Sequence, residues 1–318
     1  MWKEQYYKLL FSKNKEDCNF EKAMILKSEN IPLSLYKYRA VNEYTLSNLK
    51  DDLVWCSRAD TFNDPFDSGV TKNISVHHEQ TKNLLIREFC ESFKLDYQDM
   101  LHITKSLNLE RTQQLLIDML KNAGIEIPTS FIETMNEKVQ SSLDGTIDLF
   151  EEHLENLNDF IQKRVYASCF SEEPLSILMW SHYADNNKGI CLEYNFSDLE
   201  FPSYLAYDIH PVKYTDSIID LTLYENTKHI RKALLASLNK SKDWEYEKEW
   251  RIAVDYSDNK DLGFPYEVTK PVSIIMGSRI SDSDKKLVLD IAKDKGIVAK
   301  QVKENKLNRK LYIIDDKH

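Results

Sequence analysis

The stretch VYASCFSEEPLSILMWSHYADNNKGICLEY, residues 165–194, holds the clearest fold signals of this 318-residue chain. Its first part, Val165–Ser171, is rich in β-branched, aromatic and small side chains and predicts a strand. Pro174–Ala184 has helical spacing with Ser171 as the expected cap, and Gly189–Tyr194 predicts a buried strand. A strand, a short helix and a second strand in one stretch indicate a sheet with helices packed on it.

Strand and helix signals continue on both sides of this stretch. Before it, two aromatic strand candidates flank a helix that Asn42 caps, and an Asx/Pro turn follows at Phe62–Asp67. After it, we expect helices at Leu223–Asn239 and Asp282–Lys295 and strands at Glu249–Val254, Val272–Met276, Ile297–Val302 and Lys310–Ile314. Strands outnumber those of one parallel βαβ series, so the sequence predicts an α+β fold with a mixed or antiparallel sheet.

The pattern changes along the chain and predicts three parts. Residues 1–34 form a helical lead-in, residues 35–73 and 165–318 form the sheet-containing core, and residues 74–164 form a large helical insertion. Within the insertion, Glu133–Gln162 carries eight carboxylates against one lysine. A solvated helix face explains this charge, and a basic partner is the alternative.

Composition excludes several classes of protein. The chain has only 7 glycines, and none lies within four positions of another, so it lacks both a glycine-rich dinucleotide fingerprint and a Walker-type phosphate loop. Its five cysteines fit neither a zinc pair nor a disulfide frame, which indicates a reducing, cytoplasmic location. We expect no membrane span and no export signal. The net charge of -10 opposes general attraction to nucleic acid, but the basic segment 295–310 is a local exception that predicts a nucleic-acid contact.

The strongest local anomaly is the charged segment Glu245–Arg251. In an extended strand Glu245, Glu247, Glu249 and Arg251 would share one face, because side chains alternate. Three carboxylates on one face are unfavourable unless a site needs them or Arg251 neutralises them. An edge strand protected by charge is the alternative.

Two shorter motifs carry polar groups that suit a ligand. The segment Tyr36–Arg39 supplies aromatic rings and two cations that can hold a phosphate or stack on a flat ring. In the turn, Asn63, Asp64 and Asp67 can ligate a metal or fix the loop, and turn chemistry favours the second use.

The helix predicted within residues 165–194 also offers candidate site residues. One face of this helix carries Leu175, Leu178, Met179 and His182. This pattern predicts that His182 packs in the core. The alternative is a substrate-binding role for Trp180, His182 or Tyr183.

Five motifs in a fixed order resemble the widespread bacterial domain-of-unknown-function family 2971. They are YKYR (36–39), FNDPFD (62–67), CFS (169–171), MWSHYADNNKGICLEY (179–194) and WEYEKEWR (244–251). The resemblance covers roughly Leu35 to Asp315, and the family name carries no activity.

The same motifs resemble, more distantly, ADP-ribosyltransferases of the arginine–serine–glutamate class. In that class an early arginine, a middle serine motif and a late Glu-X-Glu hold NAD. The matching positions here are Arg39, Ser168 with Ser171, and Glu247 with Glu249. The serine motif departs from the class because its serines are three residues apart.

This likeness implies an NAD-consuming ADP-ribosyltransferase, acting as a bacterial toxin or phage-defence effector. Glu249 would stabilise the oxocarbenium-like ribosyl cation, and Glu247 would orient or deprotonate an acceptor, either nucleic acid or protein. The implied NAD-binding residues are Tyr36, Arg39, Ser168, Ser171, Trp180, His182 and Tyr183, with Arg39 on the pyrophosphate and Tyr36 or Trp180 stacked on a ring. No metal is expected. We therefore expect Arg39, Tyr183 and Glu249 to line one cleft.

Two other functions are also compatible with the sequence. A metal-dependent nuclease would use a set of carboxylates and a histidine base: Asp64, Asp67, Asp185, Glu249 and His182. A non-enzymatic binding or sensor module would use the same residues as scaffold.

Overall fold

The computed structural model describes residues 2–12, 15–72, 74–143, 147–196, 203–224, 229–256 and 261–315. Residues 225–228 of the predicted helix Leu223–Asn239, and residues 144–146 of the acidic segment, lie outside the described residues. The chain divides into two compact units. The first contains residues 1–69, 159–219 and 226–318, and the second contains residues 70–158 and 220–225.

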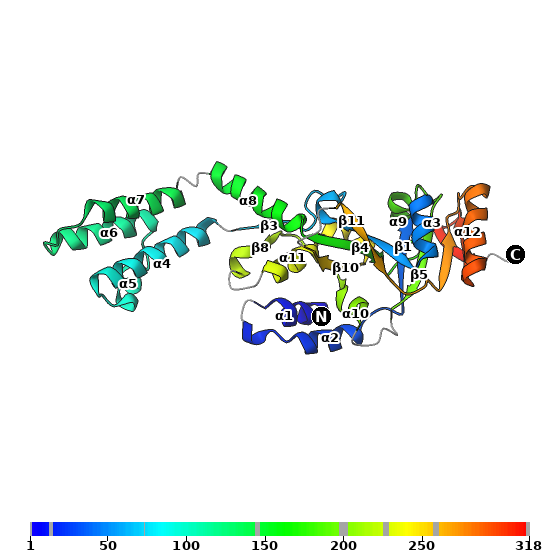
Figure 1. Ribbon diagram of the computed structural model, residues 1–318, viewed down its shortest axis with the longest axis horizontal. Coiled ribbons are helices and arrows are strands. Elements are labelled where there is room, and N and C mark those ends of the chain that lie inside the picture. The colour runs from blue at the N-terminus through cyan, green and yellow to red at the C-terminus, as the bar shows by residue number, and fades with distance from the viewer. Residues whose placement is uncertain are drawn as a thin grey trace. The chain divides into compact units, whose positions relative to one another are not determined.

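The first unit is built on a ten-stranded mixed sheet (Figure 1). Its strand order is β11-β2-β4-β1-β5-β12-β13-β14, with β10 paired to β4 and β6. The strands are β1 (Ser34–Arg39), β2 (Leu53–Arg58), β4 (Val165–Ser171), β5 (Ile190–Asn195), β6 (Ile209–Pro211), β10 (Glu249–Asp255), β11 (Gly263–Glu267), β12 (Ser273–Met276), β13 (Val298–Asn305) and β14 (Lys310–Asp315). Strands β12 and β13 pair in parallel, whereas the other described pairs of this sheet are antiparallel. The predicted α+β class with a mixed sheet is confirmed.

Helices and short strands connect this sheet. The helices are α1 (Trp2–Phe11), η1 (Lys15–Asp17), α2 (Phe20–Ser28), α3 (Glu43–Lys50), η2 (Ala59–Thr61), α9 (Ile177–Tyr183), α10 (Tyr204–Asp208), α11 (His229–Ser237), η4 (Lys242–Glu247) and α12 (Asp282–Lys295). Strands β7 (Lys213–Thr215) and β9 (Asn239–Ser241) form a separate parallel pair.

Local capping explains where two of the helices begin. Asn42 caps α3 as predicted, because its side chain accepts a hydrogen bond from the backbone nitrogen of Thr45 at 2.9 Å. Helix α9 begins later than predicted. Its cap is Ser176 rather than Ser171, because Ser171 is still the last residue of β4.

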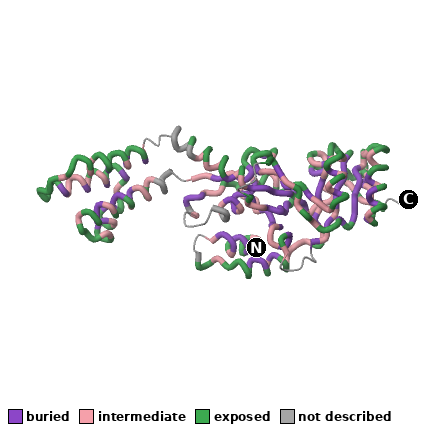
Figure 2. Tube along the Cα trace, viewed as in Figure 1, coloured by how far each residue is buried: buried purple, intermediate pink, exposed green. Residues whose placement is uncertain are grey.

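Hydrophobic side chains cover both faces of the sheet. One face packs Leu35, Leu192 and Tyr194 in a cluster that also contains Leu49 of α3 and Val288 of α12. The other packs a second cluster that contains Tyr38, Cys191, Ile275 and, from α9, Met179 and Trp180. Figure 2 shows buried residues concentrated along the strands. Because side chains alternate along β1, Lys37 and Arg39 follow Leu35 onto the first face.

The second unit has its own helical core. Its elements are β3 (Val70–Thr71), α4 (Ile74–Phe93), α5 (Tyr97–Thr104), α6 (Leu109–Asn122), α7 (Thr129–Leu143), the start of α8 (Ile147–Gln162), the second residue of β8 (Ile219–Asp220) and η3 (Leu221–Tyr224). Ile86, Phe89, Leu116 and Val139 belong to one buried cluster of this unit. Among the described helices of the whole chain, none has the length and apolarity to cross a membrane.

Candidate functional site

A cavity lies beside the place where two neighbouring strands of the sheet stop pairing. Strand β1 pairs with β5 at six positions but with β4 only at Tyr36 and Ser171. Residues of both β1 and β4, together with residues of β2, α9, β9 and β10, line a cavity of ≈ 340 Å³. Seven of the nine site residues that the sequence predicts lie on its wall: Tyr36, Arg39, Ser168, His182, Tyr183, Glu247 and Glu249.

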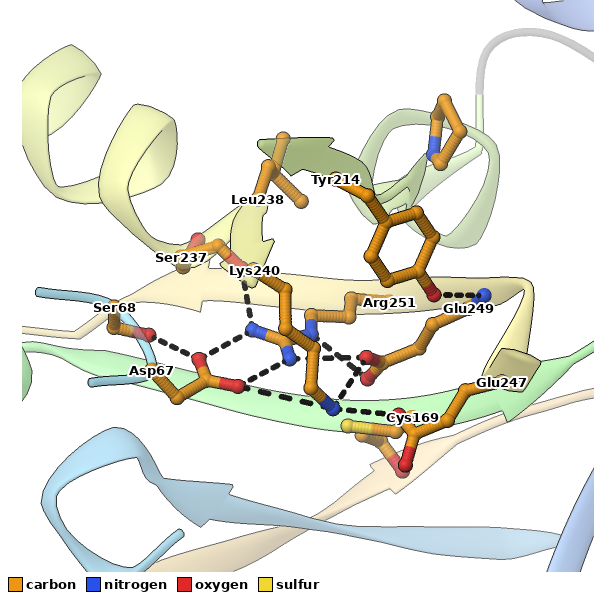
Figure 3. A network of polar contacts seen from close by, with 12 residues as sticks. Asp67, Ser68, Cys169, Tyr214, Ser237, Leu238, Lys240, Glu247, Glu249 and Arg251 are labelled. Carbon is orange, nitrogen blue, oxygen red and sulfur yellow. Dashed lines mark hydrogen bonds and ion pairs between the residues drawn. The ribbon is translucent and has the colours of Figure 1, made fainter. Parts of the chain in front are cut away.

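Arg251 organises the charged wall of this cavity (Figure 3). Its guanidinium donates to both carboxylate oxygens of Asp67, at 2.7 and 2.6 Å, and to both oxygens of Glu249, at 2.8 and 3.0 Å. The fifth N–H donates to the carbonyl oxygen of Ser237 at 2.6 Å. All five donors of a fully buried arginine are therefore used.

Lys240 joins the two glutamates of the Glu-X-Glu motif. Its ammonium donates to Glu247 at 2.5 Å and to Glu249 at 3.1 Å, and lies 4.0 Å from Asp67. The other oxygen of Glu247 accepts the hydroxyl proton of Tyr183 at 2.7 Å. We call Asp67, Lys240, Glu247, Glu249 and Arg251 the acidic cluster, because three carboxylates face two cations.

The two glutamates of the acidic cluster have opposite pKa shifts. Burial alone would raise the pKa of Glu249, but the charges of Arg251 and Lys240 outweigh it and hold that pKa well below its ordinary value. The pKa of Glu247 is raised, first by burial and then by the charge of Glu249. Glu249 is thus a fixed negative charge, whereas Glu247 is able to exchange a proton closer to neutral pH.

A tight turn brings the two glutamates together. Residues 242–247 form η4, and Lys248 has a left-handed backbone with φ 44°, so strand β10 begins only at Glu249. The prediction of one extended strand face from Glu245 to Arg251 is therefore wrong for residues 245–248, and Glu249 and Arg251 are the pair that share a strand face. Ser171 fixes this turn by donating its hydroxyl proton to the carbonyl oxygen of Glu247 at 2.6 Å.

Arg39 is a further cation on the wall of this cavity, apart from the acidic cluster. No carboxylate lies within ion-pair distance of its guanidinium among the residues that the structure describes, and no hydrogen bond engages it there. Burial lowers its pKa, and the neighbouring Cys169, Tyr194 and Cys56 offset that effect only in part. The residue also lines a second cavity of ≈ 440 Å³, which shares Lys37, Arg39 and Trp55 with the first. Arg39 thus stands where the two cavities adjoin.

Two predicted site residues do not line the cavity. Trp180 is fully buried, donates its indole N–H to the carbonyl oxygen of Pro174, and packs edge-to-face with Tyr38. It is therefore not available to stack on a ligand, contrary to the prediction. Ser171 is also fully buried, and its hydroxyl donates to the backbone carbonyl oxygen of Glu247.

Two other predictions need correction in detail. His182 is exposed on the cavity wall rather than packed in the core, because α9 turns Met179, Trp180 and Ala184 inward instead of Leu178 and His182. Tyr36 lines the cavity, but its hydroxyl donates to Glu193 on β5 at 3.3 Å.

The donors proposed for a metal-dependent nuclease do not converge. Asp67 and Glu249 are both bound by Arg251, and Asp64 accepts the backbone N–H of Phe66 within the turn. Asp185 is an exposed residue of the left-handed turn after α9. Across the described ranges, no group of three His, Cys, Asp or Glu side chains is placed to hold a metal ion.

The sequence pattern did not indicate Lys240 as a site residue, and it did not predict the contact that Lys37 makes. Lys240 follows the predicted helix Leu223–Asn239, and it lies 7 and 9 positions before Glu247 and Glu249. Both separations are odd, so the strand alternation that grouped the two glutamates does not include Lys240. Lys37 was recognisable as a cation of the Tyr36–Arg39 motif. Its contact with Ser168, at 2.6 Å, depends on the approach of β1 to β4, which local pattern does not specify.

Comparison with protein-family models gives a match to part of the chain. The family model described as "Protein of unknown function (DUF2971)" matches residues 179–252. That range contains MWSHYADNNKGICLEY and WEYEKEWR and supports the resemblance to this family. Curated proteins and solved structures give no match to the chain. The likeness to ADP-ribosyltransferases has no support from these comparisons and rests on the residues of this chain alone.

Proposed function

We propose that the cavity binds NAD and that the protein transfers ADP-ribose from it to an acceptor. One observation carries the proposal: an acidic cluster with excess negative charge lines the same cavity as Arg39, which makes no ion pair within the described part of the chain. With all members ionised, the three carboxylates and two cations of the cluster leave one negative charge.

This charge distribution is complementary to the two halves of NAD. The nicotinamide ring of NAD carries a positive charge, which favours the acidic cluster, whereas the pyrophosphate is anionic and suits a guanidinium. Arg39 offers that guanidinium without first having to break an ion pair. The adjoining cavity of ≈ 440 Å³ would take the adenosine half.

Each glutamate has a role that follows from its environment. Cleavage of the bond between nicotinamide and ribose develops an oxocarbenium-like cation, and a fixed carboxylate beside it lowers the barrier. Glu249 supplies that fixed charge, because Arg251 and Lys240 keep it ionised. Glu247, with its raised pKa, takes the proton of the acceptor as it attacks. Tyr183 holds Glu247 in place through the 2.7 Å hydrogen bond.

Nucleic acid is the acceptor to test first. The hairpin of β13 and β14 carries four cations that make no ion pair among the residues described: Lys303, Lys306, Arg309 and Lys310. Lys295 and Lys300 of the same basic segment are already paired with Asp52 and Glu193. A cluster of this kind binds phosphates in a salt-dependent way.

The test is nicotinamide release from NAD, measured with RNA, DNA and protein acceptors each present in turn. Glu249→Gln is expected to lower turnover about 10²-fold or more, the effect of removing one preorganised electrostatic group. Arg39→Ala is expected to weaken NAD binding with a smaller effect on turnover at saturation. Glu172→Gln is the matched control, because Glu172 accepts the indole N–H of Trp250 away from the cavity.

Folding of each variant is checked by its thermal midpoint before rates are compared. The proposal fails if the folded wild type releases no nicotinamide with any acceptor and NAD leaves its midpoint unchanged. Equal loss of activity in Glu172→Gln and Glu249→Gln would also contradict it.

A further inference from the structure

One pair of side chains on the cavity wall has no catalytic role in the proposed transfer of ADP-ribose. The amine of Lys37 lies 2.6 Å from the hydroxyl oxygen of Ser168 and 3.0 Å from the carbonyl oxygen of Cys169. Both side chains are almost fully buried by neighbouring protein, yet both line the cavity. An amine and a hydroxyl in contact at the edge of a cavity are the components of a base and a nucleophile.

The surroundings of Lys37 do little to keep its amine charged. No ion pair with a carboxylate forms at its amine among the described residues. The groups whose charges act on this amine are Arg39 of its own strand, Cys169 of β4, Cys56 of β2 and Glu249 of β10. The amine lies 4.8 Å from the ring centre of Phe170.

The balance of these neighbours favours the neutral amine. Burial, and then the charge of Arg39, lower the pKa of Lys37 to about 7. Slightly above neutral pH the amine can therefore donate to the Cys169 carbonyl and accept from the Ser168 hydroxyl at the same time. This is the arrangement that deprotonates a serine.

We infer that Ser168 is a nucleophile and Lys37 its general base, and that the pair attacks the acyl carbon of anionic esters. The oxygen of Ser168 bonds to the acyl carbon while its proton moves to the Lys37 amine. The alcohol leaves with the bonding electrons and takes that proton from Lys37. Water then attacks the acyl-serine, passes a proton through Lys37 to the serine oxygen, and releases a carboxylic acid.

Arg39 sets the preference for an anionic substrate. It lies two residues beyond Lys37 on the same face of β1 and has no acidic partner among the described residues. A carboxylate or phosphate on the ester would meet this guanidinium. The inference goes beyond the proposed transfer of ADP-ribose and does not depend on it, because its test contains no NAD.

The test uses a fluorophosphonate probe on the full-length protein. Attack by Ser168 forms an oxygen–phosphorus bond and expels fluoride, so the product keeps the phosphonyl group and is identified by peptide mass spectrometry. We expect one label per chain, on Ser168, with a labelling rate that rises with pH and levels off above about pH 7.

Three variants locate the reaction, and a fourth serves as the control. Ser168→Ala should remove the label, and Lys37→Met should slow labelling about 10²-fold, the scale of a lost general base. Lys37→Arg keeps a positive charge but cannot act as a base, so it should be as slow as Lys37→Met. The control, Ser57→Ala, changes another serine on the same cavity wall and should leave the label on Ser168 unchanged.

Several results would overturn the inference. It fails if the folded wild type takes no label at pH 8.5, if the label lies on another residue, or if Lys37→Arg is labelled as fast as the wild type. A wild-type rate that shows no rise between pH 6 and pH 8 would also refute the role of Lys37. This pH profile needs no variant, so a misfolded substitution leaves the inference testable.

Discussion

Replacement of Arg251 by methionine should destabilise the first unit more than the loss of any other single ion-pairing side chain described here. The wild-type guanidinium is fully buried and uses five donors on Asp67, Glu249 and the Ser237 carbonyl. Methionine fills part of the volume but offers no donor. Asp67 would then keep the hydrogen bond from Ser68 and the Lys240 ammonium at 4.0 Å, and Glu249 would keep Lys240, whose ammonium already binds Glu247.

The magnitude follows from the burial of both carboxylates. Removing one partner of a buried ion pair costs about 3–5 kcal/mol, because the remaining charge stays desolvated and uncompensated. Arg251 serves two such carboxylates, so we expect about 4 kcal/mol or more. Folded domains have about 5–15 kcal/mol of stability in total. At about 2–4 °C per kcal/mol for a unit of this size, Tm should fall by about 8–16 °C.

Urea unfolding followed by tryptophan fluorescence measures this change. Arg164→Met is the matched control, because Arg164 also binds a carboxylate, Asp255, but its side chain is 20% exposed. That variant removes the partner of one carboxylate instead of two, so it should lose less stability than Arg251→Met. Unfolding free energies of Arg251→Met and wild type that agree within about 1 kcal/mol would refute the organising role of Arg251 in the site.

Four further predictions concern stability, each measured by denaturant unfolding. Glu249→Gln should destabilise the fold above pH 4.5, because the depressed pKa of Glu249 stabilises the fold there and that stability is lost as the pH falls. Glu247→Gln should be neutral or stabilising at pH 8, because the raised pKa of Glu247 means that its ionised form destabilises the fold. Lys27 has a pKa lowered by burial to about 7 against 10.5 in the unfolded chain, so wild-type stability should rise between these values and Lys27→Met should remove that rise. Gly189→Ala should cost about 1–3 kcal/mol, because its Cβ would lie 2.2 Å from the carbonyl oxygen of Arg39. Asn42→Ala should cost about 1 kcal/mol by uncapping α3. A loss of stability in Glu247→Gln as large as that in Glu249→Gln would contradict the first prediction. A pH dependence of stability in Lys27→Met equal to that of the wild type would contradict the second. Wild-type stability in Gly189→Ala or in Asn42→Ala would contradict the third or the fourth.

Local pattern was sufficient for some of the regular elements of the fold. Asp282–Lys295 is a helix with the predicted bounds, since Ser281 caps its start and Gly296, with a positive φ of 63°, ends it. Val165–Ser171 is likewise a strand with the predicted bounds. The error at residues 245–248 has a different origin, because the left-handed backbone of Lys248 is imposed by contacts of the turn and not by a residue type that favours it.

Part of the candidate cavity wall could be predicted from the sequence, but its ion pairing could not. Alternation and motif order pointed to Arg39, Glu247 and Glu249, and all three line one cavity. Nothing in the local pattern indicates that Arg251 binds Asp67, which lies 184 positions away. Pairing at that separation depends on how β10 and the turn before β3 meet, and this is a property of the tertiary fold.

Calorimetric titration of NAD into the wild type and Arg39→Ala tests the first step of the proposed function. The wild type should bind one NAD per chain, and Arg39→Ala should bind it about tenfold or more weakly, because a charge-assisted hydrogen bond contributes about 1.5–3 kcal/mol. The fold should be unaffected, since Arg39 makes no ion pair within the described residues. No binding by the folded wild type, or equal affinity in the two proteins, would contradict the assignment of this cavity to NAD.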